Sequence, residues 1–268
     1  MFFWGNAMIE IIIALIGSIA AGAWDLKTTE VPDEIPVLMI SLGLFYWFIN
    51  AVASSNFFPL FVSLLVGTIL LIFGFAMYRT KQWGGADALI LSAIGYVIPI
   101  YAGRIFMLDY IFNFFIVGAA YTIVYAIVLG IMNRFVFSYF VKDVKENIKV
   151  VAGIPGIFAC FVVAMFIAGF FIIPLLYILL LIIFITLFWR YGLIIESRVF
   201  RRRVKTKNLK VGDVIDDMRW VGLKEEELKA IQKKKQYAIV KEGIRFVSAF
   251  PIALVFTLLF GNILFLFI

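Results

Sequence analysis

Asp25 and Asp87 are the two residues of this sequence whose type and position could together carry out a reaction. Asp25 ends a long apolar stretch and Asp87 begins a shorter one, and ionisable groups at membrane depth are costly and usually functional. Two carboxyl groups at one depth could hydrolyse a peptide bond, one ionised to take a proton from water and one protonated to polarise the carbonyl. The competing interpretation is that each aspartate only marks a helix boundary at the membrane interface.

The inventory of side chains excludes other common catalytic sites. The chain contains no histidine and one cysteine, Cys160. A Ser-His-Asp triad, a Cys-His pair, an HExxH zinc site and a cysteine-rich metal cluster are therefore excluded. We expect no metal and no cofactor. Because Cys160 lies within an apolar run, we also expect it to be a buried, unreactive thiol.

Transmembrane helices must position the two aspartates. The 268 residues are 64% hydrophobic with a mean hydropathy of +1.06, far above the range of soluble domains. Apolar stretches of about 18 residues or more predict spans at 7–24, 35–53, 57–78, 110–132 and 246–268. The uncharged run 150–189 predicts a hairpin of two spans that turns near 169–174, and the short run 88–102 predicts a helix surrounded by others. The fold class is an all-α polytopic membrane protein with about eight transmembrane helices.

The charge distribution predicts how these spans cross the membrane. Lys and Arg collect in short cytoplasmic loops, and eight alternating spans place 22 of the 24 basic residues on one side. These are Lys27, Arg79 and Lys81, and those within 134–149 and 190–241. We therefore expect a multi-pass protein of the cell membrane with its N-terminus outside. Asp25 and Asp87 are two full crossings apart, so both should lie at the cytoplasmic face.

The chain divides into four predicted regions. A catalytic membrane core with spans one to four occupies 1–105, and 106–190 holds spans five to seven with a basic cytoplasmic loop. A basic cytoplasmic domain, 191–242, reads as a strand-and-turn segment followed by a charged amphipathic helix, so we expect a small α/β insert before the last helix, 243–268. Its charge is explained by the neighbouring anionic bilayer. Nucleic acid is not an expected partner, because no groove-reading motif accompanies the charge.

The sequences around both aspartates resemble those of one family of membrane proteases. "AWDLKTTEVPDEI", 23–35, and "GGADALILSAIG", 84–95, resemble the two motifs of type IV prepilin peptidases and archaeal preflagellin peptidases, the second of which is usually GxGD. The order and approximate separation of the motifs also agree, and the resemblance covers roughly 7–105. "VKEGIRFVSAFPIAL", 240–254, looks like the segment that opens the last helix of archaeal members.

Gly84, Gly85 and Ala86 precede the second aspartate, and Ala86 departs from the family's usual glycine. A positive φ angle at residue 86 is therefore not expected. The two glycines would let the loop approach a substrate backbone closely and turn sharply into the fourth helix. A plain turn between two spans would explain the glycines but not the aspartate.

The resemblance implies an aspartic endopeptidase that removes the short basic leader of type IV pilin-like or archaellin precursors, with Asp25 and Asp87 as catalytic residues. The cytoplasmic loop after Asp25 contains Glu30, Asp33 and Glu34, which could draw a basic leader toward the site. The absence of CxxC motifs favours the peptidase-only archaeal type.

The ends of the helices suggest how the two aspartates divide the work. Asp87 begins a helix, where the dipole favours a negative charge, and Asp25 ends one, so Asp87 would be the base and Asp25 the acid. Glu10 lies near the outer end of the first span and could reach lipid headgroups. Three alternatives remain: an ion- or proton-coupled transporter that uses Asp25 and Asp87, a protease that cleaves deep within the bilayer, and a noncatalytic scaffold.

Overall fold

The computed structural model describes residues 7–80, 82–215, 222–223, 225–234 and 236–266. Lys81 and parts of the predicted 191–242 and 243–268 regions lie outside the described residues. The chain forms two compact units, Met1–Ile123 with Gly243–Ile268 (unit 1) and Val124–Glu242 (unit 2). The two units are defined by which residues lie close together in space. They do not test the four regions expected from the sequence, which remain a prediction.

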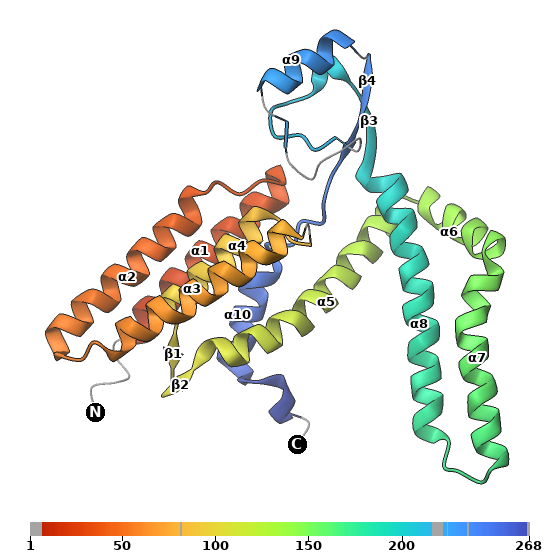
Figure 1. The fold of residues 1–268 in the computed structure, drawn as a ribbon, viewed down its shortest axis with the longest axis horizontal. Helices are drawn as coiled ribbons and strands as arrows, with labels where there is room; N and C mark the ends of the chain where they lie inside the picture. Colours follow the sequence, from red (N-terminus) through yellow and green to blue (C-terminus); the bar gives the residue numbers. More distant parts are fainter. Residues whose placement is uncertain (1–6, 81, 216–221, 224, 235, 267–268) are drawn as a thin grey trace. The chain divides into compact units, whose positions relative to one another are not determined.

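Helices dominate the described part of the chain (Figure 1). Six of them are long and apolar enough to cross a membrane: α1 (Ala7–Thr28), α2 (Glu34–Ser54), α3 (Phe58–Arg79), α5 (Phe106–Met132), α7 (Ile148–Ile167) and α8 (Ile173–Ile195). Two shorter apolar helices, α4 (Gly85–Val97) and α10 (Ala249–Phe260), stand where the sequence predicts two further spans. The chain is thus a polytopic membrane protein, and the count of eight spans remains a prediction.

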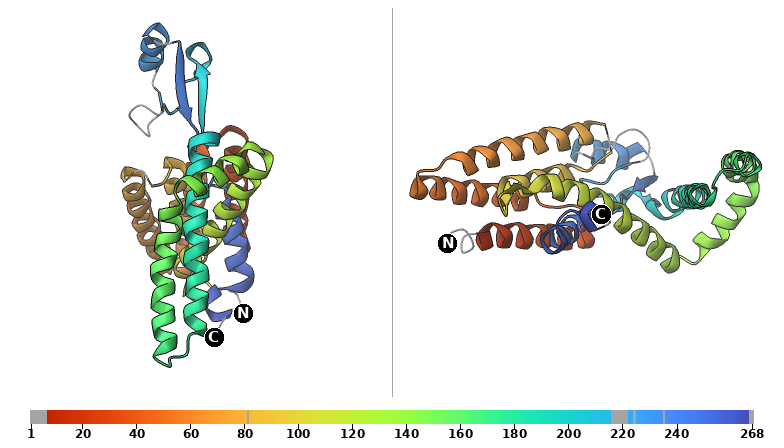
Figure 2. Two further views of the ribbon diagram at one scale, coloured as in Figure 1. Left: turned by 90° about the vertical axis from the view of Figure 1, so that its right-hand side faces the viewer. Right: turned by 90° about the horizontal axis from the view of Figure 1, so that it is seen from below.

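In unit 1, α4 packs against α1, α2 and α3 (Figures 1 and 2). Nearly all its side chains are buried, and Ile90 and Ile94 have no exposed surface at all. α3 approaches closely because a Cβ atom on Gly74 would come within 2.8 Å of the Ala88 Cα, so only glycine fits there. Side chains from the neighbouring helices donate hydrogen bonds to the last carbonyls of α4: Trp47 Nε1 to Val97 at 3.1 Å, and the Ser63 hydroxyl to Tyr96 at 2.6 Å. The surrounded short helix that the sequence predicts is therefore present.

The last apolar segment is shorter than the sequence predicts. A single span was expected over 246–268, but α10 stops at Phe260 and Gly261 takes a positive φ of 68°. The buried side chain of Asn113 on α5 causes this end: its Nδ2 donates to the Gly261 carbonyl at 2.6 Å, and its Oδ1 accepts from the Ile263 N–H at 3.0 Å. A short 3-10 turn, Ile263–Leu266, follows.

Unit 2 contains an antiparallel helical hairpin, α7 and α8, that turns at Gly169. The turn lies within the predicted 169–174. Cys160 on α7 is exposed, so the expectation of a buried thiol is wrong. Its helix packs against few other parts of the protein, and most of its surface is not covered by protein atoms.

Two further elements precede and follow the hairpin. The amphipathic helix α6 (Phe135–Glu146) occupies what we expected to be a loop. After the π-helical turn Glu196–Phe200, strand β3 (Arg201–Lys205) pairs antiparallel with β4 (Tyr237–Lys241), and α9 (Glu225–Lys234) lies between them in sequence. Strand and charged helix thus occur as predicted in the described part of 191–242. In unit 1, the two-residue strands β1 (Ile100–Tyr101) and β2 (Arg104–Ile105) link α4 to α5.

Candidate active site

The fold brings Asp25 and Asp87 together. Asp25 lies in the last turns of α1 and is 6% exposed, and Asp87 lies in the first turn of α4 and is 8% exposed. α1 packs against α4, and the two carboxyl groups are close enough for the charge of Asp25 to act on Asp87. α1 continues three residues beyond Asp25 to Thr28, so the aspartate is part of the helix rather than its end.

Residues 245–248, which precede α10, close over Asp25. The Val247 N–H donates to Asp25 Oδ2 at 3.1 Å, and the guanidinium of Arg245 attracts the same carboxylate. Arg245 also donates through Nη1 to the Leu26 carbonyl at 2.5 Å. Asp25 therefore has a hydrogen-bond donor and a positive charge beside it.

This segment is held against α1 by close packing and by α5. A Cβ atom on Gly22 would come within 3.1 Å of the Ser248 Cα, so glycine permits the approach, and the Ser248 hydroxyl donates to the Gly22 carbonyl at 3.2 Å. From α5, the Tyr121 hydroxyl donates to the Arg245 carbonyl at 2.7 Å. The sequence analysis did not identify Arg245 as part of the site. The resemblance of 240–254 to the family was the signal that could have found it.

Asp87 has fewer partners. Its Oδ2 accepts the Gly84 N–H at 2.9 Å, and its Oδ1 is buried with no hydrogen-bond partner among the described residues. A Cβ atom on Gly84 would stand 3.1 Å from Oδ2, whereas one on Gly85 would make an ordinary 3.9 Å contact with Tyr78. Gly84 thus leaves room for the carboxylate.

The residues between Gly84 and Asp87 have ordinary backbone conformations. Neither glycine takes a positive φ angle, and neither does Ala86, as expected from its departure from the family pattern. A tight turn is therefore not what requires glycine here. Whether the glycines also admit a substrate backbone remains a prediction.

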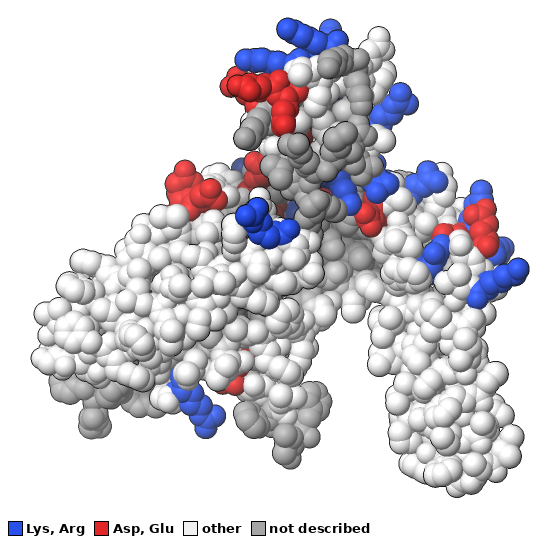
Figure 3. Space-filling model, viewed as in Figure 1, with Lys and Arg blue, Asp and Glu red and all other residues white. Residues whose placement is uncertain are grey.

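Glu30, Asp33 and Glu34 are exposed in and beside the short loop that joins α1 to α2. Acidic atoms gather at this end of unit 1 in Figure 3. Thr29 takes a positive φ of 64° and its N–H donates to the Asp25 carbonyl at 2.9 Å, so the loop turns away directly after the aspartate's own helix turn. The three acids therefore lie only five to nine residues after Asp25 in the sequence. None of them forms an ion pair with a described residue.

Glu10 lies on α1, far from the dyad. It is 3% exposed and bonded to the Tyr46 side chain, so the expectation that it reaches lipid headgroups is wrong. Fifteen residues separate Glu10 from Asp25, which is roughly 22 Å along a helix. Among the described residues, no group of three Asp, Glu or Cys side chains could hold a metal ion.

Residues 12–132, which include both aspartates, match the model of the type IV leader peptidase family. Preflagellin peptidase of Methanococcus voltae is 34% identical over 95 residues, and that of Methanocaldococcus jannaschii is 31% identical over 96 residues. Each match covers 35% of this chain and 40% of the relative, so it spans about two fifths of the curated relatives' length. No solved structure matches the chain significantly. The predicted resemblance to type IV leader peptidases, and to preflagellin peptidases among them, is therefore confirmed.

Proposed function

We propose that this protein is a membrane aspartic endopeptidase that removes the short basic leader of type IV pilin-like or archaellin precursors. The observation that carries the proposal is that Asp25 and Asp87, 62 residues apart in sequence, are both buried on two helices that pack against each other. The names of the two curated relatives support preflagellin as the substrate class.

The partners of the two carboxyl groups favour a division of labour opposite to the one inferred from helix dipoles. Asp25 is bonded by the Val247 N–H and attracted by a full positive charge on Arg245, which outweighs the partial charge at a helix end. Asp87 has one donor and a buried Oδ1 without a partner, an oxygen that suits a proton. We therefore assign the resting negative charge to Asp25 and the shared proton to Asp87.

Hydrolysis then proceeds in two steps, each with two proton transfers. Asp25 takes a proton from a water molecule, whose oxygen attacks the scissile carbonyl carbon, while Asp87 gives its proton to the carbonyl oxygen. The resulting tetrahedral diol collapses when Asp25 passes its proton to the amide nitrogen and Asp87 recovers one from a hydroxyl. The C–N bond breaks, which releases a carboxyl group and an amine and restores the starting protonation state.

The charge distribution supports a site at the cytoplasmic face, with the N-terminus outside. A basic leader in the cytoplasm would meet Glu30, Asp33 and Glu34 beside the end of α1, and the apolar helix that follows the leader would remain in the bilayer. The scissile bond would then lie at the interface, where water is available to the dyad.

The test is cleavage of a purified archaellin precursor by the full chain in detergent, followed by mass spectrometry of the product. Asp25→Asn and Asp87→Asn should each slow cleavage by at least roughly 10³-fold, because each removes one proton carrier. Glu10→Gln is the matched control, since it neutralises another buried carboxyl group on α1, and it should leave the rate unchanged. Cleavage by either aspartate variant at the wild-type rate would reject the dyad and leave the transporter alternative standing.

A further inference from the structure

The amphipathic helix α6 joins two helices that are long and apolar enough to cross a membrane. α5 ends at Met132 and α7 begins at Ile148, so very short links tie both ends of α6 (Phe135–Glu146) to those helices. A helix held in this way lies where its two neighbours leave the apolar core of the bilayer.

The positions of the charged residues in unit 2 independently indicate where the helices leave the apolar core of the bilayer. No charged residue stands between Lys149 at the start of α7 and Arg190 near the end of α8. Each helix thus offers roughly 18 uncharged residues, or about 27 Å, close to the thickness of the hydrocarbon core. Trp189, beside Arg190, is half exposed, as is typical of side chains at the interface. In Figure 3 the hairpin is uncharged except at this end.

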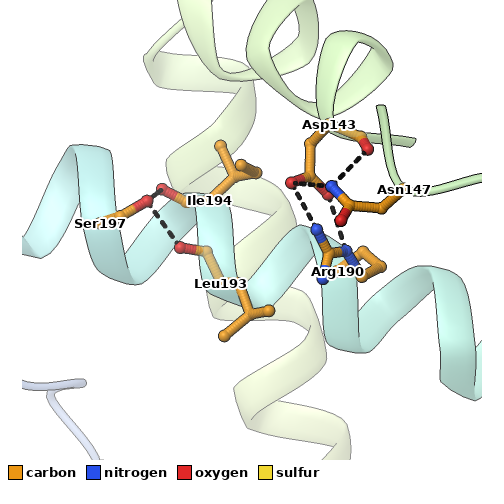
Figure 4. Close-up of polar contacts among 6 residues, drawn as sticks. All are labelled: Asp143, Asn147, Arg190, Leu193, Ile194 and Ser197. Carbon is orange, nitrogen blue, oxygen red and sulfur yellow. Dashed lines mark hydrogen bonds and ion pairs between the residues drawn. The ribbon is translucent and has the colours of Figure 1, made fainter. Parts of the chain in front are cut away.

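An ion pair fixes α6 to α8 (Figure 4). The Asp143 carboxylate accepts Arg190 Nε at 2.7 Å and Nη2 at 2.5 Å, and Asn147 Nδ2 donates to Asp143 Oδ1 at 3.2 Å. Val136 is fully buried on the same side of α6. Near this pair, the Ser197 hydroxyl donates to the Leu193 carbonyl at 2.7 Å as α8 passes into its π-helical turn. Asp143 is therefore neutralised within the protein, which leaves the outward side of α6 basic.

The exposed surface of α6 and its two ends combines cations with an apolar ring. Arg134, Lys145 and Lys149 are exposed and make no ion pair with a described residue; we call these three residues the α6 basic surface. Beside them Phe137 is 69% exposed, a costly arrangement in water but a usual one for a helix that rests in the headgroup region. Long basic side chains at that depth extend toward phosphate groups.

We propose that the α6 basic surface binds the headgroup phosphates of anionic phospholipids. Its position at the boundary of the bilayer and its charge both fit this ligand, and the fixed ion pair holds the three cations in place before the lipid arrives. This interaction is independent of the proposed peptidase activity, because every residue involved belongs to unit 2.

The test measures lipid retained by the full-length protein in a nonionic detergent, by native mass spectrometry. Phosphatidylglycerol should bind in preference to phosphatidylcholine, and salt at about 0.5 M should weaken that preference through screening. The triple variant Arg134→Gln, Lys145→Gln and Lys149→Gln should bind phosphatidylglycerol at least about tenfold more weakly, since each cation near an anionic surface contributes roughly fivefold.

The matched control removes the same charge elsewhere in unit 2. Lys207→Gln, Lys210→Gln and Lys233→Gln lie on exposed positions of the α/β element, and together they should lower binding by no more than about twofold. Equal loss in both triple variants would reduce the effect to net charge and overturn the proposal. Equal retention of both lipids by the wild-type protein would overturn it as well. Both triple variants keep the ion pair between Asp143 and Arg190, so α6 should remain folded against α8. An unchanged melting temperature checks this.

Discussion

The two units place their polar side chains differently. In unit 1, Asp25, Asp87, Asn113 and Ser248 are buried within the helix bundle and bonded mainly to backbone groups far away in sequence. In unit 2, by contrast, the charged side chains lie beyond the uncharged run 150–189 of the apolar hairpin. All the ion pairs found between described residues are there, and most are exposed.

The difference shows where the chain tolerates the cost of polarity at membrane depth. A buried polar group without a partner is expensive, so a bundle keeps such groups only where hydrogen bonds or chemistry require them. Unit 1 uses them to shape the end of α10 and to build a site around two carboxyl groups. Unit 2 keeps its hairpin apolar and places charge at the boundary.

The largest stability effect should follow from Asn113→Leu. This substitution removes the partners of the Gly261 carbonyl and the Ile263 N–H, and it should lower the free energy of unfolding by about 2–4 kcal/mol. The melting temperature in detergent measures it. In unit 2, Arg202→Gln breaks an exposed ion pair with Glu242 and should leave the melting temperature nearly unchanged. Similar shifts for both variants would erase the distinction between the units.

Arg245→Gln should slow precursor cleavage by roughly 10- to 100-fold, because Asp25 loses the positive charge that holds it ionised. The pH–rate profile is the decisive measurement: the variant should lose activity at a higher pH than the wild type as the solution is acidified. Arg245→Lys keeps the charge and should recover much of the rate. If the rate of the Arg245→Gln variant is lower at every pH but its pH–rate profile does not shift, Arg245 has a purely structural role.

Gly84→Ala should reduce the cleavage rate by roughly five- to tenfold. The added Cβ would stand 3.1 Å from Asp87 Oδ2, so the carboxylate must move by a few tenths of an ångström, and small misplacements of catalytic groups are costly. Gly85→Ala is the control, since its Cβ would meet Tyr78 at 3.9 Å and should change the rate less than about twofold. Equal rates for the two variants would show that the carboxylate needs no such room.

The smallest effect should come from the exposed loop. Replacing Glu30, Asp33 and Glu34 together by lysine should raise KM for a lysine-rich leader by roughly three- to tenfold at low salt and leave kcat unchanged. A neutral-leader precursor serves as the control substrate. An unchanged KM at low salt would remove these residues from leader binding.

The sequence predicted those features of the fold that depend on residues close together in the chain. Runs of apolar residues locate the long helices, and the shortness of 88–102 indicates a surrounded helix. The common depth of Asp25 and Asp87, which the parity of the spans predicts, remains a prediction. Each of these follows from residues that are adjacent or regularly spaced. The resemblance of the two motifs added a function for the aspartates.

What the sequence did not predict depends on contacts between distant residues. The bond from Val247 to Asp25 joins residues 222 positions apart, and no spacing or periodicity in the sequence predicts that pairing. Likewise α10 ends early because of Asn113 on another helix, and Glu10 is buried because α2 covers it. The helix α6 was not predicted, because its basic residues were interpreted as a solvated loop between two spans.

Cross-linking of residues 25 and 87 is the most direct test of the shared site. In a Cys160→Ala background, the pair Asp25→Cys and Asp87→Cys should be joined within one chain by a short bifunctional thiol reagent, as seen by mass spectrometry of linked peptides. Asp87→Cys with Ser54→Cys, a partner at the far end of α2, should give no link. If the first pair also stays unlinked while both thiols react singly with a monofunctional reagent, the two carboxyl groups do not meet and the proposed dyad is wrong.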